Sequence, residues 1–255
     1  MDLFNLDGKI ALISGAGSGL GRQFAEALSG AGAAVVLAAR RREKLEETAE
    51  LVRDKGGKAI CLELDVTDSL SVTNCVRETM SEFGTLDILV NNAVIAKQDF
   101  LTDISEEDWD AVLDTNLKGV FMMAQAAAKS MINAGKPGSI INIASILGLR
   151  VSKRVGSYIA SKSAVVQLTK AMAIEWSRYD IRVNALAPGY FITEINREQF
   201  ADGRADEFLK QGVPMGRVGE LHEIDGPLLL LASDAGSFMT GSIIAVDGGH
   251  VCSSL

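Results

Sequence analysis

The chain has 255 residues, of which 47% are hydrophobic, and its 33 acidic and 25 basic side chains leave a formal charge of −8. This balance excludes a basic nucleic-acid binder, because affinity for phosphate needs clustered cations. Three widely spaced cysteines exclude a disulfide-stapled secreted domain, and no apolar run approaches the roughly 20 residues of a membrane span, so we expect a cytoplasmic protein with no membrane partner.

Short apolar runs alternate with amphipathic segments along the whole chain. The apolar runs cover 9–14, 33–39, 58–64, 86–90, 139–144, 181–186 and 243–246, and each is typical of a strand buried on both faces. Helical periodicity covers 20–31, 42–55, 69–83, 106–132, 157–176 and 220–233. This order predicts a single α/β domain over 1–255, doubly wound, with a seven-stranded parallel sheet and helices on both faces. Ligands of such sheets bind at the carboxyl ends of the strands.

A glycine-rich turn joins the first expected strand to the first expected helix. It reads S-G-x-x-x-G-x-G, which departs from the common G-x-G-x-x-G. Glycine lets backbone amides approach a pyrophosphate at the positive end of a helix. A plain corner also favours glycine, but a turn after the first strand favours a dinucleotide site. The residues expected to bind the cofactor here are Ser14, Gly15, Gly17, Ser18, Gly19, Leu20 and Gly21.

The second strand ends at Ala39-Arg40, beside the expected position of the cofactor's adenosine ribose. An acidic residue there would favour the 2′-hydroxyl of NAD(H), whereas an arginine offers a 2′-phosphate a charge-assisted contact of about 1.5–3 kcal/mol. The sequence therefore predicts NADP(H) in preference to NAD(H), which stays the alternative. We interpret 41–44 as the solvated start of the next helix.

Polar residues also follow the third and fourth strands. Asp65-Val66 ends the third strand, and Asp65 is expected either to accept a hydrogen bond from the adenine amino group or to cap the helix near Ser69. Asn91 either binds the ribose side of the cofactor or closes a turn. Asn92 and Ala93 are expected to bind the cofactor, because they lie at the same sheet edge as the glycine turn.

Three residues after the fifth strand carry the expected chemistry. Ser145 follows the strand directly, Tyr158 comes 13 residues later, and Lys162 lies four beyond Tyr158 on the same helix face. Lowering a tyrosine pKa from 10 to about 7 takes roughly 4 kcal/mol, which one cation at 4 Å supplies at an effective dielectric of 20. We therefore expect Lys162, aided by the charge of an oxidised nicotinamide, to lower the pKa of Tyr158. Y-x-x-x-K alone is weak and Ser145 alone could cap a turn, but beside the glycine turn the three residues predict acid–base catalysis.

In these residues the chain resembles the short-chain dehydrogenases/reductases of the single-domain branch, which include 3-oxoacyl-thioester reductases and alcohol dehydrogenases. The resemblance covers 9–249 and implies a Rossmann fold and a homo-oligomer, a dimer or a tetramer, formed by the helices at 106–132 and 157–176. The residues that carry it are Ser14-Gly15, Gly19, Gly21, Asp65, Asn91-Asn92-Ala93, Asn116, Ser145, Tyr158, Lys162, Pro188-Gly189 and Asp247-Gly248-Gly249.

The resemblance implies a catalytic tetrad of Asn116, Ser145, Tyr158 and Lys162. Tyr158 would exchange a proton with the reacting oxygen and Ser145 would donate a hydrogen bond to that oxygen. Lys162 would lower the pKa of Tyr158 and hold the nicotinamide ribose, while Asn116 would organise a water linked to Lys162. Asn116 lies on an apolar helical stripe, where a buried amide needs partners, so a purely structural amide is its alternative.

The resemblance also implies the nicotinamide contacts, which are Pro188, Gly189, Ile192 and Thr193. One departure from the family pattern is Val94, which stands where glycine is usual and adds bulk beside the cofactor. The segment 190–215 lacks a strand pattern, and we expect it to form a lid. Substrate contacts are expected from Val94, Leu147, Val155, Tyr190 and Ile195.

The resulting hypothesis is an NADP(H)-dependent oxidoreductase that interconverts a ketone and a secondary alcohol, with a small-molecule ketone or alcohol or an acyl thioester as its substrate. Arg150, Lys153 and Arg154 form a basic cluster that could meet the phosphates of an acyl carrier or form a solvated loop. The alternatives are an NAD(H)-dependent alcohol dehydrogenase and a non-catalytic cofactor-binding regulatory protein. A nucleotide-sugar epimerase is disfavoured because 255 residues leave no room for a separate substrate domain.

Overall fold

The computed structural model describes residues 3–193, 209–210 and 212–253. Seven parallel strands form its sheet in the order β3-β2-β1-β4-β5-β6-β7, which confirms the predicted doubly wound fold. The strands are β1 (Ile10–Ser14), β2 (Ala34–Ala39), β3 (Ala59–Glu63), β4 (Ile88–Asn91), β5 (Gly138–Ile143), β6 (Ile181–Pro188) and β7 (Ile243–Val246).

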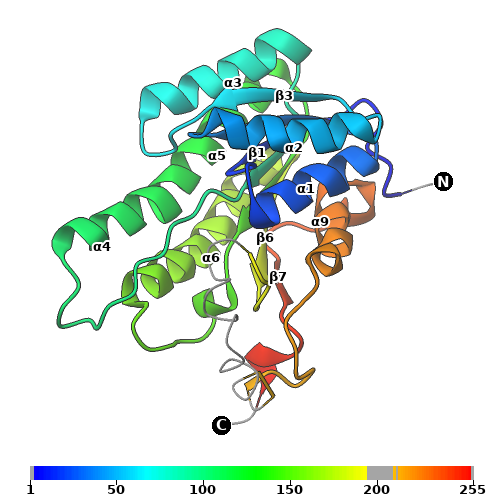
Figure 1. Cartoon of the computed structure of the whole chain (residues 1–255). Coiled ribbons are helices and arrows are strands. Elements are labelled where there is room, and N and C mark those ends of the chain that lie inside the picture. The colour runs from blue at the N-terminus through cyan, green and yellow to red at the C-terminus, as the bar shows by residue number, and fades with distance from the viewer. Residues whose placement is uncertain (1–2, 194–208, 211, 254–255) are drawn as a thin grey trace.

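Helices cover both faces of this sheet (Figure 1). Their bounds are α1 (Gly19–Gly30), α2 (Arg42–Asp54), α3 (Ser69–Phe83), α4 (Glu106–Leu113), α5 (Gly119–Ala134), α6 (Gly156–Trp176) and α9 (Asp225–Ala232). Asp68 and Ser105 accept hydrogen bonds from the first turns of α3 and α4, which explains where these two helices begin. Gly84 and Gly135 end α3 and α5 with φ of 70° and 62°, a left-handed conformation that glycine adopts without strain.

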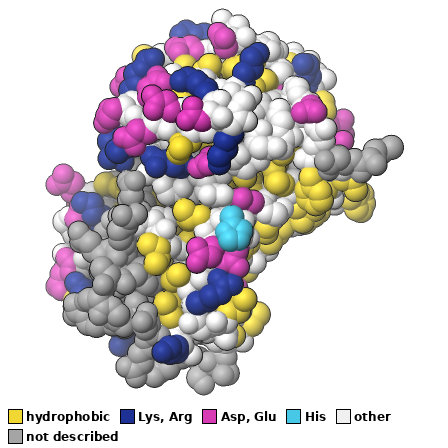
Figure 2. Space-filling view, turned by 45° about the vertical axis from the view of Figure 1, so that its right-hand side comes forward, with side chains coloured by type: hydrophobic (Ala, Val, Ile, Leu, Met, Phe, Trp, Pro, Cys, Tyr) yellow, Lys and Arg dark blue, Asp and Glu magenta, His cyan; other side chains and the backbone are white. Residues whose placement is uncertain are grey.

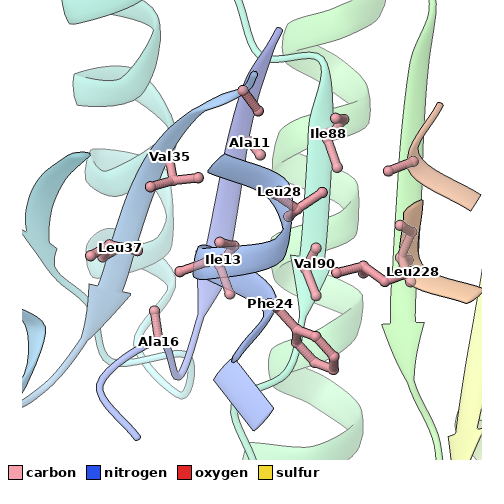
Figure 3. Packing of buried hydrophobic residues seen from close by; sticks show 14 of the residues in the cluster. Ala11, Ile13, Ala16, Phe24, Leu28, Val35, Leu37, Ile88, Val90 and Leu228 are labelled. Atoms are coloured by element: carbon pink, nitrogen blue, oxygen red, sulfur yellow. The ribbon is translucent and has the colours of Figure 1, made fainter. Parts of the chain in front are cut away.

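Successive side chains of a strand point to opposite faces of the sheet, so alternate residues pack in two different hydrophobic cores. Ile13 of β1 packs with Phe24 and Leu28 of α1 in the core shared with α2 and α9. Figure 3 shows Phe24 and Leu28 over Ile13, with Val90 of β4 and Leu228 of α9 beside them. Leu12 faces the opposite core, which α3, α5 and α6 close. The sheet is therefore covered on both sides, and its carboxyl edge is left to bind ligands.

The predicted helix over 106–132 is wrong in one respect. Five residues between α4 and α5, Asp114–Lys118, form a π-helical turn with one extra residue. This turn contains Asn116, which is fully buried. The last predicted helix is also divided, because a 3₁₀ turn at Leu221–Ile224 precedes α9.

The surface around α2 carries charges of both signs. Figure 2 shows basic and acidic side chains interspersed over the upper part of the visible face. Charged side chains pair within α2, including Arg42 with Glu46 and Lys44 with Glu47. Within the described residues, no helix combines the length and the apolar character that crossing a bilayer requires.

Candidate functional site

A cleft with a volume of about 520 Å³ lies at the carboxyl edge of the sheet. The segments that follow β1 to β6 all contribute to its walls. One end, which we call the Arg40 end, is lined by Arg40, Asp65 and Val66, and the other, the Tyr158 end, by Ser145 and Tyr158. The predicted residues that line the cleft are Gly15, Gly17, Ser18, Gly19, Leu20, Gly21, Arg40, Asp65, Val66, Asn92, Ala93, Val94, Ser145, Leu147, Val155, Tyr158, Lys162, Pro188, Gly189, Tyr190 and Thr193.

The glycine turn is shaped so that backbone, rather than side chains, faces the cleft. Gly15 has φ of +67°, and a Cβ on Gly21 would lie 2.1 Å from the carbonyl oxygen of Gly15. Ser18 precedes α1 without a side-chain hydrogen bond to it, so its hydroxyl does not occupy the first amides of the helix. Such a turn fits the pyrophosphate of a dinucleotide, because amides and the positive helix end favour an anion.

Ser14 supports the turn from below and does not line the cleft. Its side chain is 1% exposed, and its Oγ accepts hydrogen bonds from the amides of Asn92 and Ala93 at 3.0 and 3.1 Å. Nδ2 of Asn92 donates in return to the carbonyls of Ser14 and Gly15, both at 3.1 Å. The predicted contact of Ser14 with the cofactor is therefore indirect: this residue joins the end of β1 to the segment after β4.

Three cations line the Arg40 end, namely Arg40, Arg41 and Lys44. Residues 41–44 form the start of α2 as expected, and Arg41 and Lys44 line the cleft as well. Lys44 stands against the glycine turn, since a Cβ on Gly17 would lie 2.9 Å from the Cβ of Lys44. Its ammonium also pairs with Glu47 at 2.8 Å. The local positive charge fits a phosphate group.

Asp65 forms a local turn at the Arg40 end. Its Oδ1 accepts from the amide of Thr67 at 2.9 Å and from the hydroxyl of Thr67 at 2.7 Å. These bonds, with a smaller contribution from Arg40, hold the pKa of Asp65 below its usual value. Asp65 does not cap α3, because Asp68 accepts from the amide of Leu70 at that helix start. Asp65 lines the cleft, so the other predicted role, accepting a hydrogen bond from the adenine amino group, stays a prediction.

Asn91 does not face the cleft. Its side chain is 2% exposed, and Nδ2 donates to Oδ1 of Asn142 on β5 at 2.9 Å. Nδ2 of Asn142 donates to Oγ1 of Thr169 on α6, also at 2.9 Å. These three buried side chains connect β4, β5 and α6. Asn91 is therefore neither a ribose contact nor a turn residue but part of a polar connection inside the fold.

Ser145, Tyr158 and Lys162 meet at the Tyr158 end. Ser145 follows β5 and accepts from the amide of Leu147 at 3.1 Å, so it caps a 3₁₀ turn and also lines the cleft. A hydrogen bond with Ser145 acts to lower the pKa of Tyr158. Lys162 is one helical turn beyond Tyr158 on α6, with its Nζ 5.6 Å from the centroid of the Tyr158 ring. A proton donor, a hydroxyl partner and an amine thus share one wall.

The electrostatics of this wall differ from expectation. Burial lowers the pKa of Lys162 to about 7, and its Nζ donates to the carbonyl of Ile143 at 2.7 Å. Burial also raises the pKa of Tyr158 and outweighs the bond with Ser145. The predicted lowering of the Tyr158 pKa included the charge of an oxidised nicotinamide beside Lys162, and it stays a prediction for the protein with its cofactor bound. A lysine that titrates near 7 is only partly charged at neutral pH, which reduces its attraction for a tyrosinate.

Asn116 holds the segment after β4 in place. Its Oδ1 accepts from the amide of Ile95 at 2.9 Å, and its Nδ2 donates to the carbonyl of Ile95 at 2.8 Å. Nδ2 also lies 3.3 Å from Oγ of Ser161, the neighbour of Lys162 on α6. Asn116 does not line the cleft in the described structure. The amide is thus satisfied by backbone, and it links the Tyr158 end to the π-helical turn.

The expected substrate contacts have mixed outcomes. Val94, Leu147, Val155 and Tyr190 all line the Tyr158 end of the cleft. Ile195 and most of the expected lid at 190–215 lie outside the described residues. Ile192 is 40% exposed and does not line the cleft, in contrast to Thr193. Gln98 and Thr115 line it without having been predicted, since neither belongs to a recognisable motif.

The comparisons agree with this geometry. A family model described as enoyl-(acyl carrier protein) reductase matches residues 15–250. The chain is 41% identical over 249 residues to 2-dehydro-3-deoxy-D-gluconate 5-dehydrogenase of Dickeya dadantii, with 98% of both chains covered. It is 37% identical over 246 residues to 3-oxoacyl-[acyl-carrier-protein] reductase of Thermotoga maritima, with 96% of this chain and 99% of the relative covered.

A solved structure extends the likeness to three dimensions. The structure of a gluconate 5-dehydrogenase from Burkholderia cenocepacia in complex with NADP and tartrate has a TM-score of 0.95 and 41% identity, with 99% of both chains covered. That relative's NADP agrees with the cofactor predicted here from Arg40. The fold, the matched residues and these identities together establish that the chain belongs to the short-chain dehydrogenase/reductase family, a family of oxidoreductases.

Proposed function

We propose that the protein is an NADP(H)-dependent oxidoreductase that interconverts a ketone and a secondary alcohol. The observation that carries the proposal is that Ser145, Tyr158 and Lys162 line the same cleft as the glycine turn. A regulatory protein that only bound the cofactor would have no need for a buried amine beside a tyrosine. NADP bound to the Burkholderia cenocepacia relative and the three cations at the Arg40 end support the choice of cofactor.

The cofactor would occupy the cleft from end to end. Its 2′-phosphate would meet Arg40, Arg41 and Lys44, and its pyrophosphate would meet the glycine turn. Pro188, Gly189 and Thr193 would border the nicotinamide. When bound, the nicotinamide exchanges a hydride with the carbonyl carbon of the substrate.

The reacting oxygen would lie between Ser145 and Tyr158. Ser145 would donate a hydrogen bond to this oxygen, and Tyr158 would donate its proton to it during reduction, or accept the alcohol's proton during oxidation. Lys162, when protonated, would stabilise the tyrosinate that forms. Its Nζ lies 5.6 Å from the centroid of the Tyr158 ring, so the ammonium would act from beside that ring. Asn116 would keep 94–96 in place through its bonds to Ile95.

The test follows NADPH absorbance with a panel of cyclic ketones, keto sugars and 3-oxoacyl thioesters. Tyr158→Phe keeps the ring and removes the proton donor, so we expect kcat to fall by at least about 100-fold. Tyr179→Phe makes the same change at a residue that is 37% exposed and does not line the cleft, and is expected to be neutral. Equal activity of the two variants, or no oxidation of NADPH by any ketone, would refute the proposal.

We further infer a homo-oligomer. The helices expected to form the subunit contact, α5 and α6, expose Phe121 at 41% and Ile174 at 79%. Burying such side chains against a second copy would gain roughly 25 cal/mol for each Å² of apolar surface removed from water. Sedimentation velocity would test this, and a monomer at micromolar concentration would contradict it.

A further inference from the structure

Five apolar residues line the Tyr158 end of the cleft beside the polar side chains of Ser145, Tyr158 and Lys162. Val94, Ile95 and Ala96 come from the segment after β4, while Leu147 and Val155 come from the segment between β5 and α6. These two segments are joined beside the cleft, because Asp99 forms a β-bridge with Val155 and its amide donates to the carbonyl of Arg154 at 2.9 Å. The apolar side chains therefore form one continuous wall, which we call the apolar wall.

The cations near this wall are engaged elsewhere. Arg150 donates to the carbonyl of His250 and to Oγ of Ser253, the latter at 2.8 Å. Arg154 lies over the ring of Phe100, 5.2 Å from its centroid. Among the described residues at the Tyr158 end, Lys162 is the one cation that lines the cleft.

Two lysines near the apolar wall are also held by other groups. Lys97 follows the Val94–Ala96 segment directly and pairs with Asp108 at 2.9 Å, outside the cleft lining. Lys162 is 2% exposed and donates to the carbonyl of Ile143. A substrate carboxylate at the apolar wall would therefore lose its hydration without meeting a free cation from the described residues.

We propose that the Tyr158 end takes an uncharged ketone with apolar carbon substituents, rather than a sugar acid. The proposal rests on the function proposed above and names its substrate class. Apolar substituents gain from the wall because each buried methylene raises affinity roughly fourfold. An unpaired carboxylate is disfavoured there by at least about 100-fold. Gln98 and Tyr190 add polar groups at the rim without adding formal charge.

A pair of matched substrates tests the proposal. 4-Methylcyclohexanone and 4-oxocyclohexanecarboxylate share the ring and the ketone and differ only in a methyl group against a carboxylate. We expect kcat/KM with NADPH to be at least about 100-fold higher for the methyl compound and to rise again for 4-ethylcyclohexanone. Comparable or higher kcat/KM for the carboxylate would overturn the proposal.

Variants locate the selectivity at the wall. Leu147→Arg places a cation at the Tyr158 end and should reduce the preference at least tenfold. Leu149→Arg makes the same change two residues later, where the side chain is 43% exposed and outside the cleft, and should leave the preference unchanged. Val155→Lys is a second wall variant, for use if thermal unfolding shows that Leu147→Arg is misfolded. Equal effects of the wall and control variants would overturn the assignment to the apolar wall.

Binding separates this inference from the proposed function. Calorimetry with the NADP-loaded protein compares 4-methylcyclohexanol with 4-hydroxycyclohexanecarboxylate, and we expect at least about 100-fold tighter binding of the former. Selective binding without turnover of any ketone would refute the oxidoreductase function and support the proposed selectivity of the apolar wall for uncharged ligands. Turnover that favours the carboxylate would agree with the oxidoreductase function and would refute the proposed selectivity of the apolar wall.

Discussion

Replacing Gly21 by alanine tests whether the glycine turn is built to receive a cofactor. The new Cβ would lie 2.1 Å from the carbonyl oxygen of Gly15 and 2.6 Å from Nδ2 of Asn92. Neither neighbour is a flexible side-chain end, because one is backbone and the other is held by two hydrogen bonds to the turn. The turn would have to move by about 1 Å to bring the first contact above 3.0 Å.

The magnitude follows from the contacts that this movement disturbs. Overpacking costs about 1–3 kcal/mol, and leaving the buried amide of Asn92 without its two acceptors costs about another 1–3 kcal/mol. If the substitution destabilises the conformation that binds the cofactor by 2 kcal/mol of this total, the Kd for NADPH rises roughly 30-fold. We therefore expect Gly21→Ala to lower both thermal stability and affinity for NADPH.

Fluorescence titration with NADPH and thermal unfolding with and without NADPH measure the two effects. Gly30→Ala is the matched control, since it lies on the same helix and its Cβ would have no heavy atom within 4 Å. This control should keep the wild-type Kd and unfold at the same or a slightly higher temperature. A Gly21→Ala protein with wild-type Kd and unfolding temperature would refute the idea that the turn is a cofactor cradle.

Three further predictions concern the cofactor end, the buried polar connection and the buried lysine. Arg40→Asp should shift the kcat/KM ratio for NADPH over NADH by about 10- to 150-fold toward NADH, while Arg42→Asp, with a 72% exposed side chain, should leave it unchanged. Asn142→Ala should lower the free energy of unfolding by about 2 kcal/mol in urea titrations, because it removes two buried hydrogen bonds, one from Asn91 and one to Thr169; a loss below 0.5 kcal/mol would contradict this. Burial lowers the pKa of Lys162 from 10.5 to about 7, so the unfolded state binds more protons between these values and stability rises with pH there. Relative to Lys162→Met, the wild type without cofactor should gain roughly 2–3 kcal/mol in unfolding free energy between pH 7 and 9, and parallel pH profiles would argue against a buried amine.

The sequence predicted the strands well because each buried parallel strand is a short apolar run that is separated from the next by a segment of helical periodicity. The sequence did not predict the π-helical turn that contains Asn116, and the reason is physical. A π-helical turn adds one residue to a helix without changing which residue types are apolar, so 106–132 still reads as one helix. The extra residue brings the Asn116 amide onto the backbone of Ile95, a contact between distant segments that periodicity does not contain.

The candidate site was predictable where a motif fixes position and uncertain where side-chain direction matters. Ser14 and Asn91 both end strands at the correct sheet edge, yet each side chain turns into the protein because successive residues of a strand face opposite sides. Lys44 was missed because its approach to Gly17 depends on how α2 packs against the glycine turn. The raised Tyr158 pKa was missed because it depends on burial, which the spacing of Tyr158 and Lys162 does not reveal.

The strand order places the two ends of the cleft on different halves of the sheet. Arg40 and Asp65 follow β2 and β3, whereas Ser145 follows β5 on the other side of β1 and β4. Among the described residues, Arg40 and Leu147 share no strand pairing or side-chain partner, so we expect changes at these two positions to combine additively. Cofactor preference and substrate preference can therefore change independently in this fold. A chain with both Arg40→Asp and Leu147→Arg should show the cofactor shift of the first variant and the substrate shift of the second, each at its full size.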